Sequence, residues 1–188
     1  MEAGFRNTNW KNLSFAIVGL GLIGGSFAKA LRKLGAKQII GVERSAATLA
    51  QAEEMKLIDV GMTEADARLQ QADVIICAIY PEAIASFIKN NVHNFKKNVL
   101  LTDVAGIKNN MITEVQAALL PEMEFISGHP MAGRQSSGLC MADAEIFRNA
   151  NYIIVPEKNN TSAAINWLES FAKALGCKHT VQVTPEEH

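Results

Sequence analysis

The chain has 188 residues, of which 48% are hydrophobic and 20% are charged. These proportions exclude a disordered or fibrous chain, and the length favours one domain that buries its core without disulfide or metal staples. Eighteen Lys and Arg residues against nineteen Asp and Glu residues give a net charge of −1. That balance gives no reason to expect nucleic acid or an anionic membrane as a partner.

The apolar runs and the cysteines predict a cytoplasmic protein. No apolar run reaches the roughly 18 residues of a membrane span, and the first residues contain no apolar segment of the signal-peptide type. Cys77, Cys140 and Cys177 are far apart and lack metal-ligand spacing. We therefore expect three reduced thiols and no metal site.

After an N-terminal extension over residues 1–12, short apolar runs alternate with helical patterns. The apolar runs lie at 15–18, 39–42, 74–79, 99–101 and 152–155, and the helical patterns that follow them lie at about 22–34, 45–56, 81–90, 107–119 and 161–175. Continuous apolar runs are typical of strands buried on both faces. Residues 13–183 are therefore predicted to form one doubly wound α/β domain, with a mainly parallel sheet and helices on both faces.

One region breaks this alternation. Residues 128–147 contain Gly128, Pro130, Gly133 and Gly138 and have no long regular period. We expect a structured loop there, with a short helix at most.

A glycine pattern joins the first strand to the first helix. Gly-Leu-Gly-Leu-Ile-Gly at 19–24 has the form G-x-G-x-x-G. In that pattern the first glycine permits a tight turn, the second lets a pyrophosphate approach the backbone, and the third lets the helix pack on the strands. The pattern indicates a Rossmann-like dinucleotide-binding domain, whose cofactor contacts would include Gly19, Leu20, Gly21, Leu22, Ile23 and Gly24. The alternative is a glycine turn that binds no nucleotide.

An acidic residue ends the second strand at the spacing that such domains use for ribose. Glu43 can accept hydrogen bonds from the ribose 2′-hydroxyl, and its charge would repel a 2′-phosphate. This favours NAD over NADP. Arg44, which is followed by Ser45, leaves NADP as an alternative cofactor, because an arginine at that place can hold a 2′-phosphate.

Two further strand ends are expected at the same edge of the sheet. Ligands of open α/β sheets bind beyond the carboxyl ends of the strands. The predicted cofactor residues therefore extend to Ala78, Ile79, Tyr80 and Pro81 after one strand, and to Asp103 and Val104 after the next. Tyr80, Pro81 and Asp103 can alternatively serve only as helix starts.

One histidine stands out from the others. His129 follows the predicted strand 125–126 and lies in Ser-Gly-His-Pro-Met-Ala-Gly at 127–133. The flanking glycines leave space for a ligand, and histidine exchanges protons near neutral pH. A catalytic base and a histidine that packs within the loop are equally compatible with this spacing.

Three motifs together resemble the prephenate and arogenate dehydrogenases of tyrosine biosynthesis. They are Gly-Leu-Gly-Leu-Ile-Gly-Gly-Ser at 19–26, Thr-Asp-Val-Ala-Gly-Ile-Lys at 102–108 and Gly-His-Pro-Met-Ala-Gly-Arg-Gln-Ser-Ser-Gly at 128–138. The resemblance implies NAD-dependent oxidative decarboxylation of prephenate to 4-hydroxyphenylpyruvate. It places the catalytic histidine, which contacts the ring hydroxyl, at His129.

The same resemblance implies a substrate site, with two departures from the family pattern. Its residues here would be Gly106, Lys108, His129, Arg134 and Gln135. Many members have a serine where this chain has Gly106, and an acidic residue where it has Gln135. Lys108 matches the family lysine; in the first turn of the predicted helix it would need a partner such as substrate or Asp103, unless it is merely exposed.

The last residues read as the start of a helix. Thr184 can cap it, Pro185 suits its first position, and Glu187 completes a capping box. Family members continue into a helical domain that dimerises and supplies an arginine for the substrate. Residues 184–188 are thus expected to lead into a missing C-terminal domain, through which a homodimer would form.

Other functions stay open at this point. One alternative is an arogenate dehydrogenase, whose substrate carries an amino group where prephenate has a keto group. The β-hydroxyacid dehydrogenases share the glycine turn but lack the His129 motif. A naturally truncated chain would be a non-catalytic dinucleotide-binding module.

Overall fold

A computed structural model describes residues 9–108 and 110–188 of the chain. Most of the expected N-terminal extension, residues 1–8, lies outside the described part. Trp10–Asn12 form a short 3-10 helix, and the Trp10 ring contacts Trp167 and Phe171 with ring centroids 5.8 and 5.6 Å away. The end of the predicted extension therefore packs against the domain.

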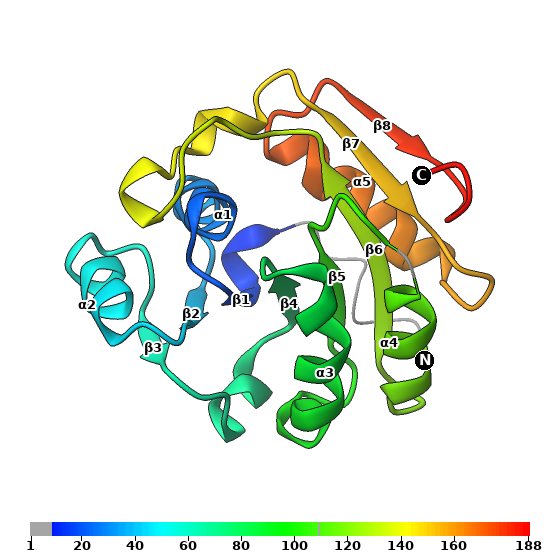
Figure 1. The fold of residues 1–188 in the computed structure, drawn as a ribbon, viewed down its shortest axis with the longest axis horizontal. Coiled ribbons are helices and arrows are strands. Elements are labelled where there is room, and N and C mark those ends of the chain that lie inside the picture. Colours follow the sequence, from blue (N-terminus) through cyan, green and yellow to red (C-terminus); the bar gives the residue numbers. More distant parts are fainter. Residues whose placement is uncertain (1–8, 109) are drawn as a thin grey trace.

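The described residues form an eight-stranded sheet (Figure 1). Its order is β3-β2-β1-β4-β5-β6-β7-β8. All neighbouring pairs are parallel except β6 and β7, so the predicted Rossmann-like, mainly parallel sheet is confirmed. The strands are β1 (Ser14–Val18), β2 (Gln38–Val42), β3 (Val60–Met62), β4 (Val74–Cys77), β5 (Leu100–Asp103), β6 (Glu124–Pro130), β7 (Asn151–Val155) and β8 (His179–Gln182).

Helices cover both faces of the sheet, as predicted. Successive residues of β1 point to opposite faces, and Phe15 joins one hydrophobic cluster while Ala16 joins the other. The first cluster includes α1 (Leu22–Leu34), α2 (Ala46–Glu54) and α5 (Ser162–Ala174), and the second includes α3 (Pro81–Asn91) and α4 (Met111–Ala118). Figure 1 shows α3 and α4 on one side of the sheet and α1 and α5 on the other.

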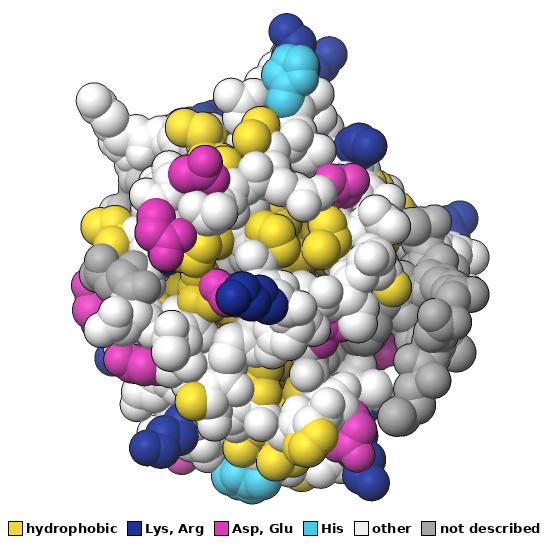
Figure 2. Space-filling view, turned by 90° about the vertical axis from the view of Figure 1, so that its right-hand side faces the viewer, with side chains coloured by type: hydrophobic (Ala, Val, Ile, Leu, Met, Phe, Trp, Pro, Cys, Tyr) yellow, Lys and Arg dark blue, Asp and Glu magenta, His cyan; other side chains and the backbone are white. Residues whose placement is uncertain are grey.

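Helix α1 occupies the predicted range and ends at Gly35, whose φ of 77° is the left-handed conformation of a glycine cap. Among the described helices, none is long and apolar enough to cross a bilayer. Among the described side chains on the face that Figure 2 shows, basic and acidic groups are interspersed.

The structure differs from the predicted elements at several points. The fourth helix begins at Met111 rather than 107, the strand predicted over 74–79 ends at Cys77, and β3 has no counterpart in the prediction. The main correction concerns His129, which lies within β6 and not in a loop after it. Tertiary pairing explains this, because β7 supplies an antiparallel partner for Gly128, His129 and Pro130 from more than 20 residues away. The rest of region 128–147 contains two 3-10 helices, η4 (Leu139–Met141) and η5 (Ala144–Phe147).

A buried ion pair joins the ends of β5 and β6. Lys108 Nζ lies 2.7 Å from Asp103 Oδ2, and the two side chains are 2% and 0% exposed. Lys108 also donates to the Gly128 carbonyl at 2.7 Å, while Asp103 Oδ1 accepts from Ser127 Oγ at 2.7 Å and from Gly128 N at 3.2 Å. Asp103 Oδ2 accepts in addition from Ala105 N at 2.9 Å. Each of these hydrogen bonds replaces part of the hydration that the two charged groups lose on burial.

Replacing one partner of this pair leaves the other charge buried and alone. We expect Lys108→Met to lower the free energy of unfolding by about 3–5 kcal/mol. The matched control is Lys96→Met, since Lys96 pairs with Asp73 at 2.6 Å with 43% and 25% exposed side chains. That change should cost about 1 kcal/mol or less. Equal midpoints for the two variants in urea unfolding would contradict the assigned role of the buried pair.

Candidate functional site

The glycine turn lies between β1 and α1, at the carboxyl edge of the sheet. Gly19 has a φ of 89°, and a Cβ added there would lie 2.6 Å from the Ala78 carbonyl oxygen. A Cβ on Gly24 would collide with the Gly19 carbonyl. The fold itself therefore requires these two glycines, whether or not a ligand is bound.

Gly21 differs from the other two glycines of the pattern. A Cβ added there would meet nothing within 4 Å. Gly21 is also the N-cap of α1, and it provides no side-chain hydrogen bond to the first turn. The open space above an uncapped helix N-terminus fits a phosphate group, because the first N–H groups of a helix lack intrahelical partners.

Glu43 lies beside this turn, at the end of β2. Its Oε2 accepts from Leu20 N and its Oε1 from Ser45 N, both at 3.0 Å. These bonds hold the carboxylate at the place where ribose is expected, with further lone pairs available to hydroxyl groups. Ser45 caps α2 through its Oγ, which accepts from Thr48 N at 3.2 Å, and Arg44 is exposed.

The other predicted cofactor residues flank the same edge. Ala78 and Ile79 are half-buried against Gly19, and Tyr80 is 80% exposed. Pro81 is the first residue of α3, so its role as a helix start is confirmed. Val104 is half-buried, whereas Asp103 is 0% exposed and its carboxylate accepts the four hydrogen bonds described for the buried ion pair. With its side chain fully enclosed, Asp103 acts on this edge of the sheet through the groups that it binds.

His129 lies on β6 beside the loop that follows β5. A Cβ added at Gly106 would be 3.2 Å from both Cε1 and Nε2 of the ring, so this edge of the imidazole faces the glycine. On the other edge, Nδ1 lies 3.1 Å from Nε2 of His188. Burial, followed by the charges of Lys108 and His188, lowers the pKa of His129, and Asp103 acts in the opposite direction. The ring is thus neutral at neutral pH, as a general base must be.

The structure changes the interpretation of the two predicted substrate cations. Lys108 precedes α4 instead of lying in its first turn, and of the partners predicted for it the structure confirms Asp103; burial lowers the pKa of its ammonium, and Asp103 opposes that shift. Arg134 forms an exposed ion pair with Asp143 at 2.7 Å instead of approaching His129, and Gln135 is exposed. Both cations are therefore engaged by carboxylates of the protein.

Sequence reasoning missed the residues that attach the 139–143 loop to α1. A Cβ added at Gly25 would lie 2.6 Å from Leu139 Cδ1 and 2.8 Å from Ala142 Cβ. Ser26 Oγ donates to Leu22 O at 2.6 Å and accepts from Asp143 N at 2.9 Å. The Gly-Gly-Ser at the end of the glycine motif could have indicated this contact, since small residues on a helix allow another segment to pack close to its backbone.

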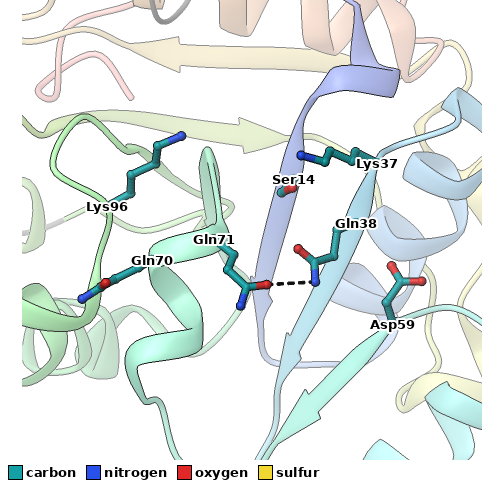
Figure 3. A pocket seen from close by; sticks show the side chains of 7 residues that line it. All are labelled: Ser14, Lys37, Gln38, Asp59, Gln70, Gln71 and Lys96. Carbon is teal, nitrogen blue, oxygen red and sulfur yellow. Dashed lines mark hydrogen bonds between the residues drawn. The ribbon is translucent and has the colours of Figure 1, made fainter.

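A polar hollow of about 620 Å³ lies at the opposite edge of the sheet (Figure 3). Ser14 and Gln38 line it from the starts of β1 and β2, and Gln38 donates to Gln71 across it at 3.1 Å. Ligands of open α/β sheets bind at the carboxyl ends of the strands. We therefore assign the candidate site to the glycine turn and His129.

Comparisons with known proteins agree with this geometry. The family described as prephenate dehydrogenase, nucleotide-binding domain, matches residues 27–181. The chain is 32% identical over 174 residues to a prephenate dehydrogenase of Bacillus subtilis, covering 92% of this chain and 47% of that protein. It is 32% identical over 173 residues to a prephenate dehydrogenase of Lactococcus lactis, covering 89% of this chain and 48% of that protein. The chain thus spans about half the length of these curated relatives.

Solved structures show the same fold. An arogenate dehydrogenase of Synechocystis has a TM-score of 0.86 at 30% identity, with 94% of this chain and 61% of that chain covered. A prephenate dehydrogenase of Aquifex aeolicus, in complex with hydroxyphenyl propionate and NAD+, has a TM-score of 0.86 at 24% identity over 94% of this chain and 61% of that chain. The family match, which covers more than half of the chain, decides the identity: this chain belongs to the prephenate dehydrogenase family and is a nucleotide-binding domain of it.

Proposed function

We propose that this domain binds NAD and supplies the catalytic histidine for oxidative decarboxylation of prephenate to 4-hydroxyphenylpyruvate, a step of tyrosine biosynthesis. The observation that carries the proposal is the placement of His129. Its neutral ring turns the Nε2 edge toward Gly106, and it stands at the end of the sheet where the glycine turn also lies. The complex of the Aquifex aeolicus relative with NAD+ supports the choice of cofactor.

The residues of the glycine turn and β2 would hold the dinucleotide. The N-terminus of α1 at Gly21 would receive the pyrophosphate, and the Glu43 carboxylate would accept hydrogen bonds from a ribose. Bound NAD would supply the hydride acceptor for the reaction.

His129 would act on the ring hydroxyl of the substrate. Nε2 takes the hydroxyl proton while carbonyl character builds at that carbon and its hydride leaves. The ring carboxylate then departs as CO₂, and its bonding electrons complete the aromatic ring and leave the ring oxygen as a phenolate. The protonated His129 returns its proton to that oxygen, which gives the phenol of 4-hydroxyphenylpyruvate and restores the neutral imidazole. Because burial and Lys108 lower the pKa of His129, the ring keeps its basic lone pair at neutral pH, and the rate should fall as the pH drops through that pKa.

Arogenate is the second candidate substrate. The 30% identity to an arogenate dehydrogenase of Synechocystis favours it. The two substrates differ only in an amino or keto group on the side chain, remote from the hydroxyl that His129 would contact. Comparing NADH formation from prephenate and from arogenate decides between them.

The position of Glu43 predicts cofactor preference. We expect NAD(H) to bind at least about tenfold more tightly than NADP(H), because the carboxylate would repel a 2′-phosphate. Titration calorimetry on the 188-residue chain measures both constants. Glu43→Gln should narrow the difference between the two affinities, and Glu54→Gln, which changes an exposed carboxylate at the end of α2, is the control that should leave it unchanged. Equal or tighter binding of NADP(H) to the wild type would shift recognition to Arg44.

Gly21 and Gly24 should respond differently to substitution. Gly21→Val adds a side chain in open space, so the protein should keep its melting temperature and lose at least about tenfold in NAD affinity. Gly24→Ala should lower the melting temperature, because the added methyl collides with backbone. Unchanged NAD affinity in a folded Gly21→Val protein would refute the assignment of the phosphate site.

Substituting the histidine tests its catalytic role. His129→Asn should reduce NADH formation from prephenate by about 10²–10⁴-fold while NAD affinity stays within about twofold. Single-turnover conditions, with protein in excess over prephenate, are suited to slow rates. His93→Asn is the control, since His93 is exposed on the short helix after α3. An unchanged rate in His129→Asn would remove His129 from the mechanism.

A further inference from the structure

The backbone that follows β8 brings the His188 side chain into contact with His129. β8 pairs with β7, and the pairing continues past the strand as Val183 N donates to Ile154 O at 3.0 Å. The chain then turns in a reciprocal capping box. Thr184 N donates to Glu187 Oε2 at 2.9 Å, and Glu187 N donates to Thr184 Oγ1 at 3.3 Å. His188 N donates to Thr184 O at 3.1 Å.

This turn places the two imidazoles edge to face. Their centroids are 5.2 Å apart with an interplanar angle of 62°, and Nδ1 of His129 lies 3.1 Å from Nε2 of His188. Two neutral rings at this separation hold one proton between these nitrogens. The direction of that bond decides which nitrogen of His129 keeps a lone pair.

Only one direction is compatible with a base at Nε2. If His188 donated, His129 would carry its proton on Nε2 and could accept none from a hydroxyl group there. If His129 donates from Nδ1, the Nε2 lone pair is free and faces Gly106. The imidazolium that forms on proton uptake can still donate from Nδ1 to the neutral His188 nitrogen, so the ring keeps its orientation, as the histidine of a catalytic triad does through its bond to the third member.

We propose that His188 is a positioning residue that accepts the Nδ1–H of His129 and so holds its Nε2 unprotonated toward the substrate. The proposal rests on the proposed function of His129 as a base. The charged side chains that act on the pair from the adjoining elements are Lys108 and Asp103. Burial and Lys108 lower the pKa of His188, which keeps it a neutral acceptor at neutral pH.

Imidazole ¹⁵N–¹H correlation spectra of the ligand-free 188-residue chain test the proposal without any turnover. In the wild type we expect the His129 proton on Nδ1. In His188→Phe, which keeps a ring but removes the acceptor, the proton should move to Nε2, the form that free imidazole side chains prefer in water. His188→Gln should restore the Nδ1–H form, because its amide oxygen can accept. His93 is the internal control and should not change.

A pH titration gives a second signature. In the wild type the pair should take up its two protons in separate steps, since the second would place two cations 3.1 Å apart. His129 in His188→Phe should titrate in one step. An Nε2–H form in the wild type, or an unaltered His129 in His188→Phe, would overturn the proposal.

The experiment separates this proposal from the proposed function. An Nδ1–H form that depends on His188, found together with an unchanged rate of prephenate and arogenate oxidation in His129→Asn, would support the positioning of the ring by His188 and refute the role of His129 as the base. If the chain oxidises prephenate while the His129 spectrum is the same in the wild type and in His188→Phe, the enzymatic role is supported and the positioning role of His188 is refuted.

Discussion

The buried pair of Asp103 and Lys108 is the interaction on which the site depends. It brings the loop after β5 against β6, and the backbone of Gly128 is bonded both to the carboxylate and to the ammonium. Since His129 is the next residue, its backbone position follows from this network. Burying two charges is costly unless each is fully compensated. The cost is offset here by four further hydrogen bonds to the same two groups, and the result is a histidine held at one place on the sheet edge.

After burial, which is the main cause of the lowered pKa of His129, the same pair also acts on the charge of the ring. Lys108 lies close enough to disfavour a second positive charge on the imidazole, and Asp103 reduces that effect. The lysine is not available as an exposed cation for substrate carboxylates, because its ammonium already has two protein acceptors. Arg134 is likewise paired, although its partner Asp143 is accessible and could be displaced by a competing anion. Within the described residues, these two cations contribute more to the shape and charge of the site than to direct capture of an anion.

The cofactor region and the histidine strand are mechanically connected. After β6 the chain crosses to α1, where Gly25 and Ser26 let the 139–143 loop pack on the first half of the helix. Lys29 of the same helix donates to the Ala142 carbonyl at 2.7 Å. The helix whose N-terminus would face a pyrophosphate thus contacts the segment that follows His129. Three glycines near the start of α1 face different surroundings: Gly24 faces the Gly19 carbonyl, Gly25 the 139–143 loop, and Gly21 open space.

The sequence by itself determined the α/β class, the range of α1, the glycine turn and the family motifs. These features depend on local periodicity, on glycine conformation and on residue identity at short spacing, all of which can be read along the chain. Only the tertiary structure decided that His129 lies within a strand, that Lys108 is buried on Asp103, and that His188 meets His129. Each of these depends on partners distant in sequence or brought together by turns. Strand β6 extends because β7 pairs with it, and the helix expected at 107 starts later because Lys108 reaches Gly128. Residue pattern identifies such groups as candidates, but the energy that selects their positions comes from contacts that exist only in the folded chain.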